Sequence, residues 1–316
     1  MILTVTLNPA LDVTYTVDAI SAHATHRVRH VVSQPGGKGV NVARILHAVG
    51  EPVLVTGLLG GVTGAFVMTQ LDAAGVPVSF VRIQGECRRT VTVVDAGEAT
   101  GFWEPGPTVT PAEWGRFVEH YAALVRLARV VVLSGSLPTG LPADAYAVLI
   151  RTAAAHRVRT ILDSSGEALW LGIAARPDIA KPDAEELAER LAATATVVSH
   201  PCIGDDDVGP ARQVLRLGAR AVVVSHGRRG LVGLTGDQAW RVAAPEAITG
   251  NAAGAGDACV AALARALHDG TPWPAPLADA VAMSAAAAGA PVAGVVDQDT
   301  YCRLRPYIAA TAQAAT

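Results

Sequence analysis

Aromatic side chains and charges are both scarce in this sequence of 316 residues. Phe, Trp and Tyr make up 4% of the chain, whereas hydrophobic residues of all kinds make up 51%. The core therefore has to be built from Ala, Val and Leu, which suits closely packed helices and parallel strands. Charged residues amount to only 17%, and so few charges beside so much hydrophobic content exclude an intrinsically disordered chain.

A large excess of one charge is also missing. The formal net charge is −3, and no block of five or six like charges occurs. This balance argues against nucleic acid as the main partner, because a phosphate backbone is bound by clustered Lys and Arg. The longest apolar stretches, such as residues 285–293, contain Gly and Pro and are too short to span a bilayer. We therefore expect no membrane partner.

Cysteine pairs at metal-ligand spacing are absent. The four cysteines, Cys87, Cys202, Cys259 and Cys302, stand apart, and no His lies at zinc-ligand spacing from them. We therefore expect neither a structural zinc site nor a disulfide framework. The chain begins with a strand-like segment and not with a basic and then apolar leader, so we expect a cytoplasmic protein.

Hydrophobic periodicity alternates between strands and helices along most of the chain. Short apolar runs predict strands at residues 2–7, 53–57, 130–133, 160–162 and 221–225. Helical spacing of apolar residues predicts helices at residues 39–49, 64–74, 143–155, 183–193 and 256–268. Because strands separated by helices pair in parallel through right-handed crossovers, the sequence predicts an α/β fold with a mostly parallel sheet.

Two segments break this alternation. Residues 11–18 and 88–95 alternate polar and apolar side chains, which is typical of strands with one covered face. We predict that they form a small second sheet lying over one edge of the core as a lid, with the lid spanning about residues 10–35 and 78–107. No Ser/Gly-rich linker divides the chain, so residues 1–316 are expected to form a single domain that carries this lid.

The strongest local signal is Asn251-Ala-Ala-Gly-Ala-Gly-Asp-Ala-Cys259, which leads into a predicted helix. Its small residues let the backbone approach a ligand, and the helix start offers unpaired N–H groups to an anion such as phosphate. Asp257 stands among these amides, where a carboxylate can accept a proton from an attacking hydroxyl. Alternatively, Asp257 is only a favourable charge in the first turn of a helix. The short motif by itself favours neither interpretation.

A second glycine-rich segment is Pro35-Gly-Gly-Lys-Gly-Val-Asn41. It is not a Walker A loop, because Gly follows the lysine where Ser or Thr is needed, and it lacks the spacing of a dinucleotide-binding loop. Its backbone amides can still meet hydroxyls or phosphates, and Lys38 and Asn41 add side-chain donors. A plain loop and helix start would also account for this segment.

Polar turns follow several of the predicted strands. Asp12, residues 134–136, residues 163–165 and residues 225–227 each come after a strand-like run. In open parallel sheets the ligand crevice forms outside the carboxyl ends of the strands. Each of these turns alone is more often simply a turn, but their joint arrangement predicts a ligand-binding edge.

Together these motifs resemble the PfkB family of carbohydrate kinases. The resemblance rests on Gly36-Gly-Lys-Gly-Val-Asn41 near the start and Gly254-Ala-Gly-Asp257 near the end, and it covers roughly residues 1–300. Three intervening segments occur in the same order: Leu133-Ser-Gly-Ser-Leu-Pro138, Asp163-Ser-Ser and Lys181-Pro-Asp183. The resemblance implies a ribokinase-like, three-layer core with a mostly parallel sheet and a small β-sheet lid.

Features near the lid look like one branch of this family, that of the 1-phosphofructokinases and tagatose-6-phosphate kinases. They are Thr6-Leu-Asn-Pro-Ala-Leu-Asp12, Arg88 at the start of a lid strand, and Glu104-Pro-Gly-Pro107. Such enzymes use ATP and Mg²⁺ to convert a sugar monophosphate into a bisphosphate, so the resemblance implies a small sugar phosphate as the other partner. It leaves open whether a monovalent cation is needed.

The resemblance also implies roles for individual residues. Asp257 would take the proton from the sugar hydroxyl, and the amides of Gly254, Ala255 and Gly256 would hold the transferring phosphoryl group. The residues implied to bind the substrate are Asp12, Gly37, Lys38, Asn41, Arg88 and Ser136, with Arg27 and Arg89 as neighbouring cations. Those implied to lie along the nucleotide are Lys181, Ser225 and Gly227, and Asp183 and Glu186 are linked to Mg²⁺.

The sequence departs from the family pattern at four positions. Asp183 stands where Asn is usual, Ala252 where Thr is common, His226 where an apolar residue is usual, and Trp103 where Asn is usual. The change at Trp103, near the lid and the sugar, bears most on which sugar is accepted. Because Asp257 is intact, we expect an active enzyme.

Two alternatives remain open at this stage, and a dehydrogenase is disfavoured because no dinucleotide-binding loop occurs. One is a kinase of the same fold for a nucleoside or an unphosphorylated sugar, in which Arg88 would be dispensable. The other is a non-catalytic regulator that binds a sugar phosphate without turnover.

Since lid sheets in this family often pair across a two-fold axis, and the apolar faces of 11–18 and 88–95 need a cover, we expect a homodimer formed through the lid.

Overall fold

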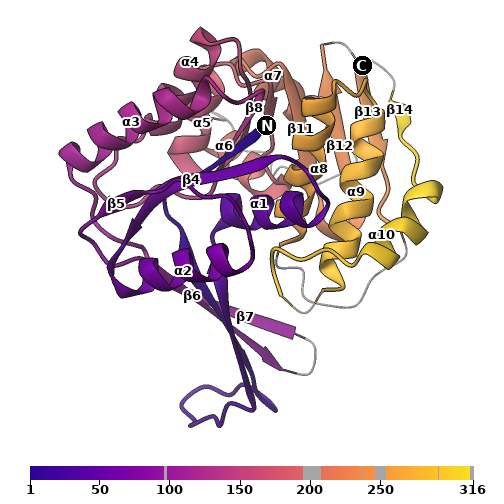
Figure 1. The fold of residues 1–316 in the computed structure, drawn as a ribbon. Coiled ribbons are helices and arrows are strands. Elements are labelled where there is room, and N and C mark those ends of the chain that lie inside the picture. Colours follow the sequence, from indigo (N-terminus) through magenta and orange to yellow (C-terminus); the bar gives the residue numbers. More distant parts are fainter. Residues whose placement is uncertain (96–97, 195–207, 237, 246–253, 291, 314–316) are drawn as a thin grey trace.

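A ten-stranded sheet forms the centre of the computed structural model, which describes residues 1–95, 98–194, 208–236, 238–245, 254–290 and 292–313 (Figure 1). The strands follow the order β14-β13-β12-β11-β10-β9-β8-β1-β4-β5. Their bounds are β1 (Ile2–Thr6), β4 (Val53–Gly60), β5 (Val81–Ile83), β8 (Val130–Ser134), β9 (Arg159–Asp163), β10 (Ile179–Ala180), β11 (Ala221–Ser225), β12 (Leu231–Thr235), β13 (Gln238–Val242) and β14 (Thr311–Gln313).

The sheet is mostly parallel, as predicted. Parallel pairing joins all strands from β5 to β11, and antiparallel pairing adds β12, β13 and β14 at one edge. The sequence analysis missed these last three strands. Thr235 pairs with Gln238 across a two-residue connection, so β12 and β13 form a hairpin that no helix separates.

Helices cover both faces of this sheet, which gives three layers (Figure 1). One face packs against α1 (Lys38–Ala48), α2 (Gly61–Ala73), α8 (Ala255–Asp269) and α9 (Ala275–Ala288). The other packs against α3 (Pro111–Val125), α4 (Ala145–Ala155), α5 (Gly166–Ala174), α6 (Ala184–Thr194) and α7 (Val208–Leu217). The short helix α10 (Gln298–Leu304) lies against α9.

Alternation of side chains along the central strands creates the two cores. In β8, Val130 and Val132 pack on one face, and Val131 and Leu133 pack on the other. All of these side chains are fully buried, which is why the strand is a continuous apolar run in the sequence. Alanine is the commonest residue that α8 and α9 contribute to this core, in keeping with the shortage of aromatic residues.

The second sheet has four strands in the order β3-β2-β6-β7 and projects from the body of the molecule (Figure 1). The strands are β2 (Ala10–Thr16), β3 (His30–Gly36), β6 (Arg88–Asp95) and β7 (Glu98–Trp103). We call this four-stranded sheet the lid. The small second sheet predicted from residues 11–18 and 88–95 is confirmed, although β3 and β7 were not recognised as strands.

The predicted helices and strands of the core are present, with bounds that differ from the predicted ones by at most three residues. No helix among the residues that the structure describes is long and apolar enough to cross a membrane. Cys87, Cys259 and Cys302 carry free thiols, and Cys202 lies outside the described residues.

Candidate active site

Polar residues converge where β1, β8, β9 and β11 end, beside the first turns of α1 and α8. Ser134 and Asp163 close their strands, Asn8 follows β1, and Ser225 ends β11. Because all four strands are parallel, these ends share one edge of the sheet. The polar turns predicted to share one edge of the sheet therefore do so, and the rest of the candidate site is built on this edge.

Asp257 lies in the first turn of α8 and is 94% buried, with 6% of its surface exposed. The helix begins at Gly254, whose left-handed backbone (φ 89°) favours glycine. Asn41 of α1 donates from Nδ2 to Asp257 Oδ2 at 2.9 Å. Burial raises the pKa of Asp257 to about 7, although Lys38 opposes this shift. A carboxyl with such a pKa can accept a proton near neutral pH.

Asp163 joins two lysines beneath the site. Its Oδ1 lies 3.3 Å from the Nζ atom of Lys181 and 3.4 Å from that of Lys38, and Ser134 donates to its other oxygen. Burial by itself would raise the pKa of Asp163, but the two ammonium groups hold it below its usual range. Lys181 is buried, whereas 45% of the Lys38 side chain is exposed. Only Lys38 is thus open to a ligand in this arrangement.

Asp12 stands at the base of the lid, in a row of cross-strand neighbours with Gln34 of β3 and Thr90 of β6. Thr90 donates to the Asp12 carboxylate. Burial raises the pKa of Asp12, opposed by the Thr90 hydrogen bond and by Arg88. The carboxylate fills the space that a side chain at Gly36 would need. Asp12 therefore has a defined position, suited to accept hydrogen bonds from hydroxyl groups.

Arg88 begins β6 next to this row. Its Nε donates to the Asn8 carbonyl at 3.2 Å, and its Nη1 lies 3.4 Å from the Glu104 carbonyl. The neighbouring Arg89 is instead exposed, and its Nε and Nη2 both donate to Glu104 Oε1. Of the two arginines, Arg88 is the one fixed at the lid base and poised to meet an anion there.

The residues Asn8 and Ser136 connect the core edge to the segment that follows the lid. Asn8 Nδ2 donates to Ser136 Oγ at 3.2 Å and to the Pro105 carbonyl at 3.1 Å. The Asn8 amide occupies the space beside Gly106, whose φ of 96° is also unfavourable for other residues. Sequence reasoning missed Asn8, although its place just after a buried strand was a usable signal.

A cavity of about 560 Å³ lies between β11, α6, α8 and α9. Its walls include Ser225 and Gly227, as predicted for a nucleotide site, and also Asp183, Ala255 and Gly256. Ser284 of α9 donates to the Ala255 carbonyl at 2.9 Å and so holds α9 against the start of α8 in the wall of this cavity. His226, Arg228 and Arg229 also line this cavity, and sequence reasoning did not assign them a role there. Lys181 does not line it; a side chain on Gly256 would come within 3.8 Å of its Nζ atom.

Asp183 and Glu186 hold each other at the start of α6. The Glu186 carboxylate accepts from the Asp183 amide at 2.9 Å, and the Asp183 carboxylate accepts from the Glu186 amide at 2.8 Å. This exchange uses one oxygen of each carboxylate. In the part of the chain that the structure describes, no third carboxylate, His or Cys joins them as a metal cluster. A Mg²⁺ ion here would complete its shell with phosphate oxygens and water, as it commonly does.

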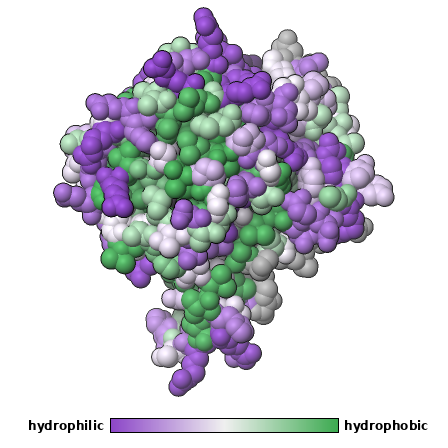
Figure 2. Space-filling view, viewed as in Figure 1, coloured by the Kyte–Doolittle hydropathy of each residue, from purple (hydrophilic) through white to green (hydrophobic). Residues whose placement is uncertain are grey.

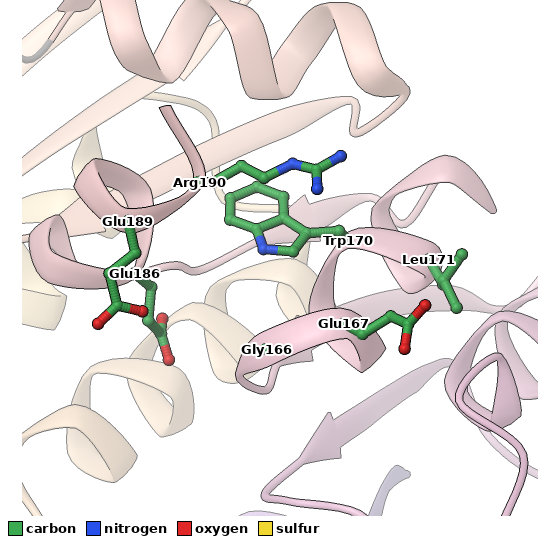
Figure 3. A pocket seen from close by; sticks show the side chains of 7 residues that line it. All are labelled: Gly166, Glu167, Trp170, Leu171, Glu186, Glu189 and Arg190. Atoms are coloured by element: carbon green, nitrogen blue, oxygen red, sulfur yellow. The ribbon is translucent and has the colours of Figure 1, made fainter. Parts of the chain in front are cut away.

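A second cavity, of about 470 Å³, lies between α5 and α6 (Figure 3). In this view Trp170 and Arg190 lie side by side, with the guanidinium carbon 5.4 Å from the centre of the ring. Glu186 lies on its wall together with Glu167 and Glu189. Apart from Glu186, none of the predicted site residues lines this cavity.

Besides Asp183, two more of the four departures noted in the sequence can be placed. Trp103 ends β7 opposite Thr90 and is 75% exposed, so it shares a lid face with Thr90 and leaves its ring open to a ligand or a partner. His226 is buried on the wall of the larger cavity. Ala252 lies outside the described residues.

A family model described as "pfkB family carbohydrate kinase" matches residues 5–298. The chain belongs to the pfkB family of carbohydrate kinases. It is therefore a phosphotransferase with an alcohol group as acceptor, and carbohydrate kinases of this family use ATP. The mixed α/β architecture with its smaller second sheet is the ribokinase-like fold.

Solved structures of other family members superpose on most of the chain. Phosphofructokinase-2 from Escherichia coli in complex with potassium is 29% identical, with a TM-score of 0.88, and the match covers 97% of this chain and 98% of that one. The same enzyme in complex with fructose-6-phosphate is 28% identical, with a TM-score of 0.85 and the same coverage. A protein described as a possible 1-phosphofructokinase from Thermotoga maritima is 25% identical, with a TM-score of 0.88 and coverage of 99% of both chains.

Proposed function

We propose that this kinase transfers a phosphoryl group from ATP to a sugar monophosphate and gives a hexose bisphosphate, in the manner of a 1-phosphofructokinase. The observation that carries the proposal is the placement of Arg88. Its guanidinium is held at the lid base by the carbonyls of Asn8 and Glu104, beside Asp12. A carboxylate for hydroxyl groups next to a fixed guanidinium suits a sugar that carries a phosphate.

The chemistry proposed for the site assigns one proton acceptor. Asp257 takes the proton from the acceptor hydroxyl, the hydroxyl oxygen forms a bond to the terminal phosphorus of ATP, and ADP leaves with the electrons of the broken bond. Asn41 holds Oδ2 of Asp257, which leaves Oδ1 to face the hydroxyl. The amides of Gly254, Ala255 and Gly256 at the helix start stabilise the charge on the transferring group.

The larger cavity is the proposed site of the nucleotide. Ser225 and Gly227 line it, and Lys181 lies behind Gly256 at the phosphate end. Asp183 and Glu186 would hold Mg²⁺, which neutralises phosphate charge when bound. Gly37, Lys38 and Ser136, at the sheet edge, are proposed to contact the sugar or its phosphate. Lys38 would exchange its contact with Asp163 for one with the ligand.

A panel of acceptors tests the proposal. ADP release is measured with ATP and Mg²⁺ in the presence of fructose 1-phosphate, fructose 6-phosphate, tagatose 6-phosphate, free hexoses, ribose or nucleosides. Turnover with one sugar phosphate supports the proposal and identifies the substrate. Turnover with unphosphorylated acceptors alone would refute the phosphate site. Binding without any turnover, seen as a rise in melting temperature, would indicate a regulator.

Replacing Arg88 by Met is expected to raise the KM for the sugar phosphate at least about tenfold, because a charge-assisted bond is worth roughly 1.5–3 kcal/mol. Steady-state kinetics with the best acceptor of the panel measures this. Arg89→Met is the matched control: its guanidinium is solvent-exposed and bound to Glu104, so its KM should stay close to that of the wild type. Equal increases of KM in the two variants would contradict the assignment of Arg88 to the phosphate site.

We also propose that the lid forms a homodimer. Val31 and Phe102 are exposed hydrophobic side chains on one face of the lid, whereas the exposed Val32 and Trp103 lie on the face that also carries Asp12. In Figure 2 hydrophobic surface continues from the body onto the projecting sheet. Exposed hydrophobic surface on a protruding sheet favours contact with a partner.

Light scattering at micromolar concentration should give the mass of a dimer, and Phe102→Ser should shift this mass toward that of the monomer. Leu127→Ser, an exposed apolar site on the core, serves as the control. A monomeric wild type would contradict the proposal.

A further inference from the structure

A half-buried arginine, Arg44, connects three segments that lie far apart in the sequence. From helix α1, its Nη1 donates to the Pro35 carbonyl and to the Ala293 carbonyl, each at 3.1 Å, and its Nη2 donates to Gln34 Oε1 at 2.9 Å. Gln34 in turn donates from Nε2 to the same Ala293 carbonyl at 2.9 Å. We call Gln34 and Arg44 the clamp. It joins the end of lid strand β3 to α1 and to the turn at Ala293.

One side of the clamp leads to the helix start that carries Asp257. The turn after α9 packs directly on Gly254: a side chain on Gly254 would lie 3.0 Å from the Ala293 Cα atom. A side chain on Gly294 would lie 2.6 Å from Arg44 Nη1 and 2.9 Å from Asn41 Oδ1. The clamp, the turn at Ala293 and Gly294, and the first residue of α8 are therefore in continuous contact.

The other side of the clamp leads to the acceptor. Gln34 is the cross-strand neighbour of Asp12, which in turn neighbours Thr90. These three residues form a row at the lid base, and Asp12 in this row is the residue proposed to bind the sugar hydroxyls. The electrostatic influence of Arg44 also reaches Asp12. A displacement of Gln34 relative to Ala293 would therefore move Asp12 relative to Asp257.

We propose that Gln34 and Arg44 are positioning residues that set the distance and angle between the acceptor hydroxyl and Asp257. Neither belongs to the nucleotide cavity, and neither needs to touch the reacting atoms. A half-buried guanidinium that donates to two backbone carbonyls and one side chain fixes geometry more strongly than a flexible ammonium. Phosphoryl transfer depends on such alignment, and a misplacement of about 1 Å can cost on the order of a hundredfold in rate. This inference rests on the proposed function.

The test compares Gln34→Leu, which breaks both links of Gln34, with Gln34→Glu, which keeps an acceptor for Arg44. Gln34→Leu and Arg44→Met are expected to lower kcat about tenfold to a hundredfold, with KM for ATP within about threefold of the wild type. Gln34→Glu keeps the bond from Arg44 but loses the donor to the Ala293 carbonyl, so its kcat should lie between that of Gln34→Leu and that of the wild type. ADP formed per sugar phosphorylated should rise in Gln34→Leu, because water competes with a misaligned acceptor. Since a loss of folded protein alone leaves this ratio unchanged, a ratio and kcat equal to those of the wild type in folded Gln34→Leu would overturn the inference.

Amide hydrogen exchange gives a readout that needs no turnover. In Gln34→Leu, exchange at Ala293–Val296 and at Ala255–Ala258 should be faster than in the wild type, while α4 is unchanged. If the wild type phosphorylates none of the acceptors, the proposed function fails, and the exchange experiment still decides the clamp. Unchanged exchange at both segments would show that Gln34 does not hold them. If Arg44→Met fails to fold, the two Gln34 variants, which alter a half-buried strand end, supply the answer.

Discussion

Asp257→Asn should lower kcat by about 10²–10⁴-fold, the usual contribution of a positioned general base. Asn has the same shape and can still accept the hydrogen bond from Asn41 through its amide oxygen, but it cannot take a proton at neutral pH. Binding of the sugar phosphate, measured by calorimetry, should stay close to that of the wild type, because other residues hold the sugar. An Asn variant with near-normal kcat would remove Asp257 from the role of base.

The pH dependence provides a second test of the same residue. Because the pKa of Asp257 is raised to about 7 by burial, kcat/KM of the wild type should fall about tenfold per pH unit below that value, as the carboxylate is protonated. The residual activity of Asp257→Asn should lack this acidic limb.

Stability should change in the opposite direction from activity. A carboxyl whose pKa is raised on folding opposes folding when it is charged, so this penalty is absent well below its unfolded pKa and is fully present above pH 7. Asp257→Asn should therefore melt at a higher temperature than the wild type at pH 8, with the difference shrinking as the pH is lowered through 7. A lower melting temperature at pH 8 would mean that the carboxylate is stabilised in the fold.

Asp163→Ala is expected to destabilise the protein by about 3–5 kcal/mol, the typical result of removing one partner from a buried ion pair. The substitution leaves the ammonium groups of Lys181 and Lys38 close together and removes the acceptor of Ser134. Urea unfolding at pH 7 measures the effect. Asp144→Ala is the control, because Asp144 pairs with Arg151 at 3.5 Å on the surface, where such pairs contribute little.

The sign of the pH effect distinguishes this carboxylate from Asp257. Since the pKa of Asp163 is held below its usual range, its contribution is present above the unfolded pKa near 4 and is lost as the pH falls through the lower, folded value. Wild type and Asp163→Ala should therefore differ in stability at neutral pH and converge in strong acid. A difference that persists at low pH would assign the effect to packing and not to charge.

Local patterns in the sequence predicted the parallel core and the small second sheet. Apolar runs such as 130–133 are buried on both faces, so the pattern and the structure agree there. The hairpin of β12 and β13 was missed because Leu231–Thr235 is short and contains glycine, which weakens the strand signal. Its connection of two residues is nevertheless typical of a hairpin.

The site was predictable only in part, because its ion pairs join distant segments. Asp257 and Asn41 belong to two motifs, and their direct contact follows from the packing of α1 on α8. The contact of Lys38 with Asp163 spans 125 residues and has no local signature. The clamp also has no local signature, because Arg44 looks in the sequence like an ordinary cation on a helix. Charge partners of this kind become visible only when the sheet order is known.

The Asp12 carboxylate fills the space next to Gly36, and this restricts how the two positions can change during evolution. Gly36 has no room for even a methyl group while Asp12 is present, although its backbone requires no glycine. A substitution of Gly36 is thus tolerated only after Asp12 has been replaced by a residue without a carboxylate. That replacement also removes the proposed hydrogen bonds from Asp12 to the acceptor hydroxyls. The order of substitutions is therefore constrained, because position 12 has to change before position 36 can accept a side chain.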